Sequence, residues 1–183
     1  MTNEKLDIRN KIAALKKEIT AEAGADLSQR IWNRLTQTDL FQKGECIALY
    51  CAMNDEVQTS GLIEEWHKKK KIVLPVVSGG NINFYAYTGK KSMTKGMFGI
   101  PEPISSTLIS PENIDLFIIP GIAFDRECNR LGRGKGYYDK FLSEVDKPTI
   151  GLCYQFQLLN HIPAEIHDKK MTMIITENTI IGD

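Results

Sequence analysis

The stretch Pro120-Gly-Ile-Ala-Phe-Asp-Arg-Glu-Cys-Asn-Arg-Leu-Gly-Arg-Gly-Lys-Gly-Tyr-Tyr-Asp139 joins an apolar segment to an amphipathic one through a loop rich in glycine and positive charge. The apolar segment before it is Leu116–Ile119, and the amphipathic segment begins at Tyr137 and continues to Leu142. A strand, a glycine-rich loop and a helix N-terminus in this order form an anion-binding arrangement, most often for phosphate. The stretch therefore predicts an anion site where a strand passes into a helix.

The centre of this stretch, Gly132-Arg-Gly-Lys-Gly136, alternates glycines with cations. Glycine adopts positive φ angles and lets a ligand approach its N–H group closely, while Arg133 and Lys135 supply full positive charges. A flexible surface loop with solvated charges is the alternative. Because apolar segments bracket the loop and Tyr137, Tyr138 and Asp139 follow it, we favour phosphate or nucleotide binding. The loop lacks the Gly-x4-Gly-Lys-Ser/Thr pattern of a Walker loop, and its single alternating glycines do not match a dinucleotide fingerprint.

The composition indicates a globular protein whose 183 residues form a single domain, residues 1–183. Lys plus Arg and Asp plus Glu both number 23, and this zero formal charge argues against a general nucleic-acid or membrane-surface binder. No apolar run approaches the ~20 residues of a membrane helix, and residues 1–9 lack the apolar core of a signal peptide, so we expect a cytoplasmic protein. The four cysteines form no Cys-x-x-Cys pair, which favours reduced thiols and argues against a zinc site.

Hydrophobic periodicity predicts alternating helices and strands. We expect a helix over about residues 4–22 that Gly24 ends, a second helix containing Leu27, Ile31 and Leu35, a third capped by Thr59 or Ser60, and a fourth over about residues 136–145. We expect strands at residues 46–51, 72–77, 82–87, 116–119 and 149–153, with a last strand at 171–176.

This alternation predicts an α/β fold with three α/β/α layers: a largely parallel mixed sheet, helices on both faces and an antiparallel addition near residue 82. Ligands bind such sheets at the carboxyl ends of the strands. The polar loops 53–59, 120–136 and 154–168 all follow predicted strand ends. We therefore expect these loops to meet at one edge of the sheet.

The chain resembles the 5-formyltetrahydrofolate cyclo-ligase family, also called 5,10-methenyltetrahydrofolate synthetases, over nearly its whole length. The resemblance is strongest in Pro120-Gly-x-Ala-Phe-Asp125 and Arg130-Leu-Gly-Arg-Gly-Lys-Gly-Tyr-Tyr-Asp139. Weaker support comes from Met53-Asn-Asp-Glu-Val57 with Thr59, Gly99-Ile-Pro-Glu-Pro103, Lys5-x3-Arg9, Ile162-Pro163, His167-Asp168 and Ile174-Ile-Thr-Glu177. The chain departs from the family at Cys128, where glycine is usual, and at Thr172, where an acidic residue is common.

The resemblance implies a fold like that of ribose-5-phosphate isomerase and CoA transferases, and an enzyme that uses ATP and Mg²⁺. In the family reaction, ATP phosphorylates the formyl oxygen of 5-formyltetrahydrofolate, and N10 then attacks the formyl carbon and expels phosphate. The products are 5,10-methenyltetrahydrofolate, ADP and phosphate. The resemblance also implies a monomer whose partners are small molecules.

The residues and the resemblance together give a candidate site. Arg133 and Lys135 are the candidate catalytic cations, because phosphoryl transfer depends on positioning and charge neutralisation. The candidate ATP-binding residues are Lys5, Arg9, Arg130, Leu131, Gly132, Arg133, Gly134, Lys135, Gly136, Tyr137 and Tyr138, among which Lys5 and Arg9 depend on the resemblance.

The other candidates concern the metal and the folate. Asp139 is the candidate Mg²⁺ ligand by its position, and Asp168 by family match. The candidate folate-binding residues are Cys51, Met53, Glu56, Phe98 and Tyr154, with Glu56 accepting N–H bonds from the pterin and Phe98 and Tyr154 stacking on a ring. We expect His161 and His167 to have no catalytic role.

Two other classes of function remain as alternatives. One is a regulatory module that binds a nucleotide or a phosphosugar without turnover. The other is an RNA-binding Arg-Gly segment, which the zero net charge and the single occurrence of the element disfavour. ATP hydrolysis that depends on a reduced formyl-folate distinguishes the enzyme from both.

Overall fold

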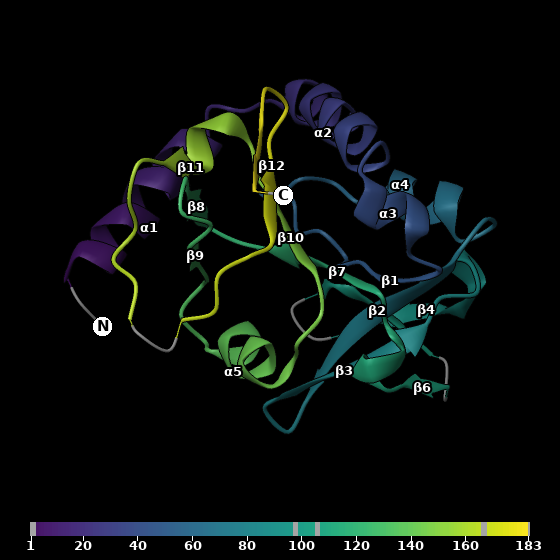
Figure 1. The fold of residues 1–183 in the computed structure, drawn as a ribbon. Helices are drawn as coiled ribbons and strands as arrows, with labels where there is room; N and C mark the ends of the chain where they lie inside the picture. The colour runs from purple at the N-terminus through teal and green to yellow at the C-terminus, as the bar shows by residue number, and fades with distance from the viewer. Residues whose placement is uncertain (1–2, 97–98, 105–106, 166–167, 183) are drawn as a thin grey trace.

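The computed structural model describes residues 3–96, 99–104, 107–165 and 168–182, and a large mixed sheet forms its centre (Figure 1). Eight strands of the described chain lie in the order β13-β12-β10-β7-β1-β2-β3-β6. Their bounds are β1 Cys46–Ala48, β2 Lys71–Ser78, β3 Asn81–Ala86, β6 Leu108–Ile109, β7 Leu116–Pro120, β10 Thr149–Leu152, β12 Met173–Ile175 and β13 Ile180–Gly182. Strands β12, β10, β7, β1 and β2 are parallel, whereas β13, β3 and β6 are antiparallel to their neighbours. The largely parallel sheet and the antiparallel addition near residue 82 are therefore confirmed.

Helices cover both faces of the sheet, so the three-layer α/β prediction is confirmed (Figure 1). The helices are α1 Asn3–Lys16, α2 Ala21–Leu35, α3 Asp39–Lys43, α4 Ser60–Trp66 and α5 Tyr137–Glu144. Apolar residues of α2, α3 and α4 pack on one face of the sheet, against Ile47 and its neighbours, and those of α5 pack on the other, against Phe117. Alternate strand residues point to opposite faces, which is why Ile47 and Ala48 belong to different apolar clusters. Burying each large side chain of these clusters contributes roughly 1.5–3 kcal/mol.

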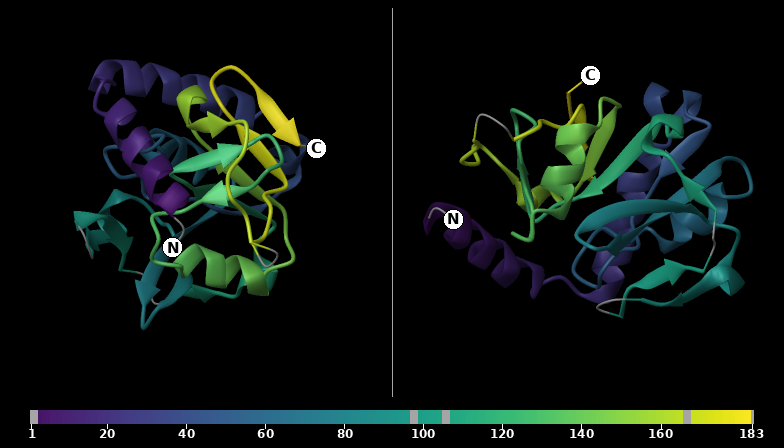
Figure 2. Two further views of the ribbon diagram at one scale, coloured as in Figure 1. Left: turned by 90° about the vertical axis from the view of Figure 1, so that its left-hand side faces the viewer. Right: turned by 90° about the horizontal axis from the view of Figure 1, so that it is seen from below.

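A second, smaller sheet lies beside the first, where the sequence predicted polar loops. It consists of β8 (Ala123–Asp125), β9 (Arg130–Leu131) and β11 (Leu158–Leu159), in the order β11-β8-β9. Helix α1 lies against it and buries Ile12 there (Figure 2). The fully buried carboxylate of Asp125 accepts N–H bonds from Asn129 and Ile162 at 2.9 Å each. This carboxylate ties the hairpin β8–β9 to the loop that follows β11.

The N-terminal helices differ from the prediction. The first helix ends at Lys16, and the side chain of Thr20 caps α2 by accepting the N–H of Ala23 at 3.2 Å. Gly24 lies inside α2, so the prediction that it ends a helix is wrong; the break is at Thr20, whose hydroxyl satisfies an N–H at the start of a helix. The prediction of a last strand at 171–176 is also incomplete, because β13 follows β12 and pairs with it.

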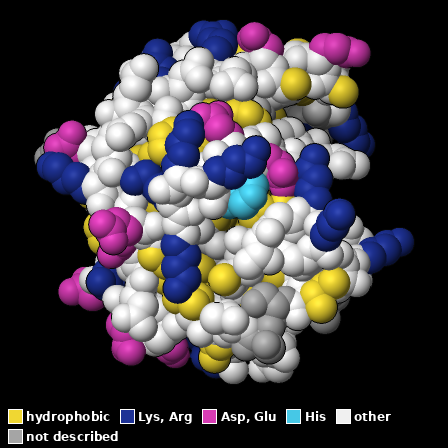
Figure 3. All heavy atoms as spheres, turned by 90° about the vertical axis from the view of Figure 1, so that its right-hand side faces the viewer, with side chains coloured by type: hydrophobic (Ala, Val, Ile, Leu, Met, Phe, Trp, Pro, Cys, Tyr) yellow, Lys and Arg dark blue, Asp and Glu magenta, His cyan; other side chains and the backbone are white. Residues whose placement is uncertain are grey.

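The segment between β3 and β7 carries a short hairpin in addition to β6. Strands β4 (Met93–Lys95) and β5 (Pro101–Pro103) pair antiparallel beside the large sheet. Figure 3 shows the side of the molecule that faces right in Figure 1, where basic side chains are dispersed with acidic ones between them. Among the described residues, no helix combines the length and the apolar character needed to cross a bilayer.

Candidate functional site

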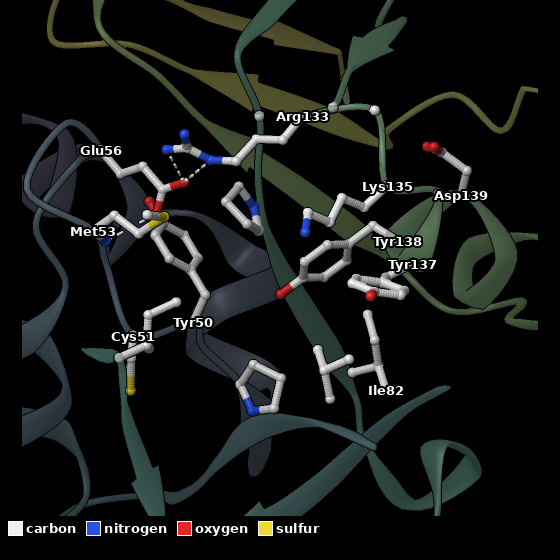
Figure 4. Close-up of a pocket in the computed structure, with 18 of the residues that line it drawn as sticks. Tyr50, Cys51, Met53, Glu56, Ile82, Arg133, Lys135, Tyr137, Tyr138 and Asp139 are labelled. Carbon is white, nitrogen blue, oxygen red and sulfur yellow. Dashed lines mark hydrogen bonds and ion pairs between the residues drawn. The ribbon is translucent and has the colours of Figure 1, made fainter. Parts of the chain in front are cut away.

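A pocket of about 280 Å³ opens at the carboxyl ends of the parallel strands (Figure 4). Its residues come from four places: the segment after β1, the end of β7, the β2–β3 hairpin with the residues at and just before β5, and β9 with the glycine-rich loop and the start of α5. They are Tyr50, Cys51, Met53, Glu56, Pro75, Val77, Ile82, Ile100, Glu102, Pro120, Gly121, Arg130, Gly132, Arg133, Gly134, Lys135, Gly136, Tyr137, Tyr138 and Asp139. The prediction that the loops after β1 and β7 meet at one sheet edge is confirmed.

The glycine-rich loop needs glycine at two positions that border the pocket. Gly134 has φ +89° and Gly136 has φ +74°, a region that other residues adopt only with strain. A Cβ atom added to Gly136 would meet no protein atom within 4 Å. The backbone of Gly136 therefore borders open space immediately before α5, where the N-terminus of a helix favours negative charge.

Arg130 braces this loop from within. Its side chain is only 5% exposed; Nη1 donates to the carbonyl of Pro120 at 3.1 Å, and Nη2 pairs with the carboxylate of Asp139. The guanidinium also lies 5.6 Å from the ring centroid of Tyr138. Lys135 and Tyr138 point toward the middle of the pocket, and the carboxylate of Asp139 points away from it (Figure 4). Burial raises the pKa of Tyr138, so its hydroxyl is a neutral donor at physiological pH.

Arg133 and Glu56 meet in an ion pair at one side of the pocket (Figure 4). Oε1 of Glu56 accepts Nη2 of Arg133 at 3.0 Å and Nε at 3.3 Å, while Oε2 accepts the N–H of Met53 at 3.0 Å. Nη2 of Arg133 also donates to Asp55 at 2.6 Å, and the other oxygen of Asp55 lies 3.2 Å from Nζ of Lys16. Four charged groups from α1, the β1–α4 loop and the glycine-rich loop are thus linked in one row of ion pairs.

Burial and ion pairing have opposite effects on the pKa values of these linked groups. Burial alone would lower the pKa of Arg133, but Glu56 and Asp55 outweigh it and raise that pKa. Burial alone would likewise raise the pKa of Asp55, which Lys16 and Arg133 hold below its usual value. Burial lowers the pKa of Lys16 despite the neighbouring Asp55. Arg133 and Asp55 are therefore both charged near neutral pH.

The other half of the pocket is mostly apolar. Pro75, Val77, Ile82 and Ile100 line it, together with Cys51 and Glu102. Burial raises the pKa of Cys51 to about 11, so the thiol is protonated and acts as a small apolar group. One half of the pocket thus suits a phosphate chain, and the other suits a flat heterocycle with a polar edge.

The structure brings most of the predicted site residues together, but not all of them. Lys5, Arg9, Leu131, Tyr154 and Asp168 do not line this pocket, and Phe98 lies outside the described residues. The side chain of Leu131 is 2% exposed and packs with Ile12 under α1, so only the backbone of this residue remains for a role near the loop.

Lys5 and Arg9 lie outside the pocket, where Arg9 contacts the glycine-rich loop and Lys5 contacts Asp168. Nε of Arg9 donates to the carbonyl of Gly132 at 2.9 Å, so α1 holds the glycine-rich loop. Nζ of Lys5 lies 3.5 Å from both Asp168 and Glu165. The i, i+4 spacing of the two cations therefore places them on one contacting face of α1, as predicted, but that face does not border the pocket.

Tyr154 does not present its ring to the pocket, which corrects the expectation that it stacks on a ligand. The residue is 4% exposed, and its ring stacks on Phe156 with centroids 5.8 Å apart. Its hydroxyl donates to the carbonyl of Glu56 at 3.1 Å. The third predicted loop therefore reaches the same sheet edge, where it supports Glu56.

The two candidate metal ligands border a common cavity. Asp139 and Asp168 both line a cavity of about 350 Å³ beside the pocket, together with Arg130. Among the described residues, no group of three or more His, Cys, Asp or Glu side chains could hold a metal by itself. Mg²⁺ prefers one or two carboxylates completed by phosphate oxygens and water, so these aspartates fit Mg²⁺ that arrives with a nucleotide.

Several pocket residues were not predicted: Tyr50, Pro75, Val77, Ile82, Ile100, Glu102, Pro120 and Gly121. Ile100, Glu102, Pro120 and Gly121 lie within quoted motifs, so a signal existed, although no role was assigned to them. Tyr50 lies at the end of the predicted β1 run, with its hydroxyl on the carbonyl of Val57 at 3.0 Å.

Fold and site together define an α/β protein whose pocket joins a cationic glycine-rich loop to an apolar chamber. The model of the 5-formyltetrahydrofolate cyclo-ligase family matches residues 1–177, and the chain belongs to this family. It is similar to the 5-formyltetrahydrofolate cyclo-ligase of Haemophilus influenzae, with 31% identity over 91% of this chain and 94% of that protein. The mouse enzyme of the same name shares 26% identity over 98% of this chain and 96% of its own.

Solved structures lead to the same family. The NMR structure of Aquifex aeolicus 5,10-methenyltetrahydrofolate synthetase superposes with a TM-score of 0.89 at 33% identity, covering 97% of this chain and 92% of that one. The synthetase from Mycoplasma pneumoniae superposes with a TM-score of 0.76 at 26% identity, covering 95% of this chain and 99% of its own. Family membership therefore extends from the motifs to the whole fold.

Proposed function

We propose that this chain catalyses the ATP-dependent cyclisation of 5-formyltetrahydrofolate to 5,10-methenyltetrahydrofolate, with release of ADP and phosphate. The observation that carries the proposal is that Arg133 and Lys135 adjoin an apolar chamber within one pocket. Phosphoryl transfer to a folate requires both kinds of surface within one site. Family membership and the names of the relatives support the same reaction.

The proposed chemistry has two steps. The formyl oxygen attacks the γ-phosphorus of ATP, the bond between that phosphorus and the β–γ bridging oxygen breaks, and ADP leaves. N10 of the folate then attacks the activated formyl carbon, the carbon–oxygen bond breaks with release of phosphate, and the N10 proton is lost. Phosphorylation turns a poor leaving group into a good one, so the protein needs to position two substrates and neutralise charge.

The glycine-rich loop would bind the phosphates. Arg133 and Lys135 offset the charge of the transferring group, and the N–H groups of Gly132, Gly134 and Gly136 donate to phosphate oxygens. Arg130 keeps the loop in shape through Pro120 and Asp139. Tyr137 and Tyr138 line the pocket at the start of α5 and would contact the nucleotide directly. Lys5, Arg9 and Leu131 lie outside the pocket lining, and we propose that they act on the ATP site by supporting the loop, as Arg9 does through the carbonyl of Gly132.

Asp139 and Asp168 would hold Mg²⁺ beside the phosphates. The ion supplies positive charge that offsets the developing charge on the phosphate oxygens. Asp139 pairs with Arg130 and Asp168 with Lys5, so metal binding would replace one cation by another at each carboxylate.

The folate would occupy the apolar chamber. Cys51 and Met53 line it, and Glu56 accepts N–H bonds from the pterin as Tyr154 supports its backbone. Phe98, which we propose stacks on a ring of the folate, lies between β4 and β5 in the sequence. The N–H donors on one edge of a pterin match a carboxylate well, because such contacts are charge-assisted and directional.

We further propose a cytoplasmic, single-domain monomer whose partners are small molecules and do not include nucleic acids or membranes. All four cysteines are free thiols, which suits a reducing compartment. The balanced charge of 23 basic and 23 acidic residues suits small-molecule substrates rather than nucleic acid.

One assay tests the proposed function. The purified chain is incubated with ATP, Mg²⁺ and 5-formyltetrahydrofolate, and the methenyl product and ADP are quantified together. We expect the two products in equal amounts, and no ADP when the folate is omitted. ATP binding without turnover would leave the regulatory module as the better description, and ADP formation without folate would contradict the coupled mechanism.

A further inference from the structure

We propose that the ion pair between Arg133 and Glu56 couples the two halves of the pocket, so that nucleotide and folate each strengthen the binding of the other. The inference rests on the proposed function, because it takes the phosphates as ligands of Arg133 and the pterin as a ligand of Glu56. It adds that the two residues are paired with each other in the structure, so each substrate competes with the residue that would bind the other substrate (Figure 4).

The lone pairs of Glu56 show why the pair must open. A carboxylate offers about four acceptor positions, two on each oxygen. Both positions of Oε1 are used by Nε and Nη2 of Arg133, and one position of Oε2 is used by the N–H of Met53. A pterin that donates two parallel N–H bonds needs a position on each oxygen. Arg133 must therefore leave Oε1 before Glu56 can accept both bonds.

Arg133 likewise cannot bind a phosphate through the same nitrogens while it is paired with carboxylates. In the pair, Nη2 serves both Asp55 and Glu56, at 2.6 and 3.0 Å. A phosphate group that binds this edge of the guanidinium competes directly with the two carboxylates. The flanking residues Gly132 and Gly134 allow the loop backbone to follow the side chain. Binding of phosphate thus releases Glu56 for the pterin.

The free energy needed to break the ion pair is then shared by the two binding events. Whichever ligand arrives first breaks the pair, and the second ligand finds its partner already released. Thermodynamic reciprocity requires the same coupling factor in both directions. Coupling factors between sites are typically about 5- to 150-fold, and because the Arg133 side chain is 40% exposed we expect a value near the lower end, about 5- to 10-fold.

Lys16 and Asp55 keep the pair in place in the absence of ligand. Asp55 bridges the largely buried ammonium of Lys16, whose side chain is 6% exposed, to the guanidinium of Arg133. This bridge anchors Arg133 to α1 and to the β1–α4 loop. It gives Arg133 a defined position to which it returns when the phosphate leaves.

The experiment measures binding without turnover. The Kd of 5-formyltetrahydrofolate is determined by calorimetry with and without a saturating β,γ-imido analogue of ATP plus Mg²⁺, and the Kd of the analogue is determined with and without the folate. We expect the folate to bind about 5- to 10-fold more tightly with the analogue present, and the analogue to gain the same factor from the folate.

Arg133→Met gives the sharper result. Removing the guanidinium releases Glu56, so we expect this variant to bind the folate alone about 5- to 10-fold more tightly than the wild type does, and to lose the coupling. A residue that only bound phosphate would leave the folate Kd unchanged, and one that contacted folate would weaken it; either outcome overturns the proposal. The matched control is Lys43→Met, which removes an α3 cation that pairs with Asp39 at 2.7 Å and lines neither the pocket nor the cavity of Asp139 and Asp168, and it should keep the wild-type values.

The wild-type measurement keeps the test decisive if Arg133→Met fails to fold, which circular dichroism would show. Independent binding of both ligands to the wild type overturns the coupling and leaves the proposed function intact. Failure of the folate or the nucleotide analogue to bind at all overturns the proposed function, and the coupling with it.

Discussion

Replacing Gly136 by alanine separates what the glycine-rich loop contributes to stability from what it contributes to binding. Gly136 has φ +74° and directly precedes α5. A Cβ atom at this position would have no protein neighbour within 4 Å, yet the residue lines the pocket. The new methyl group would therefore strain the backbone and occupy ligand space, without clashing with the protein.

The stability cost follows from the backbone alone. A residue with a Cβ atom in the left-handed region costs roughly 1–2 kcal/mol, and the reduced entropy of the unfolded chain returns roughly 0.4–1 kcal/mol for a glycine-to-alanine change. The net loss is about 1 kcal/mol, which corresponds to a decrease in Tm of roughly 2–4 °C for a chain of this size. Gly79→Ala is the matched control, because Gly79 has φ +56°, faces open space and lies at the β2–β3 turn away from the pocket.

The binding cost belongs to Gly136 only. Its methyl group would keep phosphate from the backbone N–H groups, and losing one hydrogen bond to a charged group costs roughly 1.5–3 kcal/mol, or about 10- to 100-fold in the KM for ATP. Thermal melts and steady-state kinetics on both variants test this. We expect similar Tm decreases in the two variants and a raised KM only in Gly136→Ala. If both variants keep the wild-type KM, phosphate does not approach this part of the loop.

Three further changes test other parts of the site and the fold. Lys135→Ala should lower kcat by about 10²- to 10³-fold in a protein that still unfolds cooperatively, because it removes charge beside the transferring group; a wild-type kcat would contradict its role. Asp139→Asn should raise the Mg²⁺ concentration at half-maximal activity while the KM for the folate stays constant, and an unchanged Mg²⁺ requirement would make Asp139 purely structural. Asp115→Asn should lose about 0.5–1.5 kcal/mol at pH 7, because Asp115 accepts the N–H groups of Cys46 and Glu45 at 2.9 Å each. These bonds, that of Cys46 first, hold the pKa of Asp115 below its usual value, so its contribution is present above about pH 4 and disappears as the pH falls through the folded-state pKa. Urea unfolding of wild type and variant at a series of pH values should therefore show a difference that is complete at pH 7 and decreases as the pH falls below about 4; a difference that stays constant down to low pH would contradict the assignment.

The largely parallel sheet and the position of the pocket could be predicted because both follow from local patterns. Apolar runs such as Leu116–Ile119 give buried parallel strands, and parallel strands place their following loops at one edge of the sheet. The contact between Glu56 and Arg133 confirms that the loops after β1 and β7 meet there, although 77 positions separate the two residues. Glycine at 134 and 136 was also informative, because positive φ is a property of the residue itself.

The small sheet could not be predicted, because its strands are too short for a period to show. Strands β8, β9 and β11 contain three, two and two residues, and polar residues separate them. What holds them is the buried carboxylate of Asp125, which accepts N–H groups from two separate parts of the chain. In the sequence, an aspartate followed by Arg126 and Glu127 is typical of a loop, and only the fold shows that it is buried.

Cys128 shows how a departure from a family pattern acquires a structural meaning. It has φ +65°, a region that glycine adopts without strain, so the backbone agrees with the expectation that glycine is usual at this position. The strain of roughly 1–2 kcal/mol is tolerated because backbone bonds fix the turn: the N–H of Cys128 donates to Asp125 at 3.1 Å, and its carbonyl accepts the N–H of Met171 at 2.9 Å. The departure therefore costs stability locally and leaves the loop geometry in place.

The relation between Arg133 and Glu56 was beyond the reach of the sequence. Each residue was assigned to a ligand of opposite character, Arg133 to phosphate because of its positive charge and Glu56 to a pterin because of its carboxylate. Each assignment, made separately, takes no account of a protein partner that the ligand must displace. The structure pairs the two instead, at 3.0 Å, so each substrate must displace the residue that would bind the other substrate. Assigning a ligand to each residue separately cannot show this competition, because it exists only once folding has brought the two loops together.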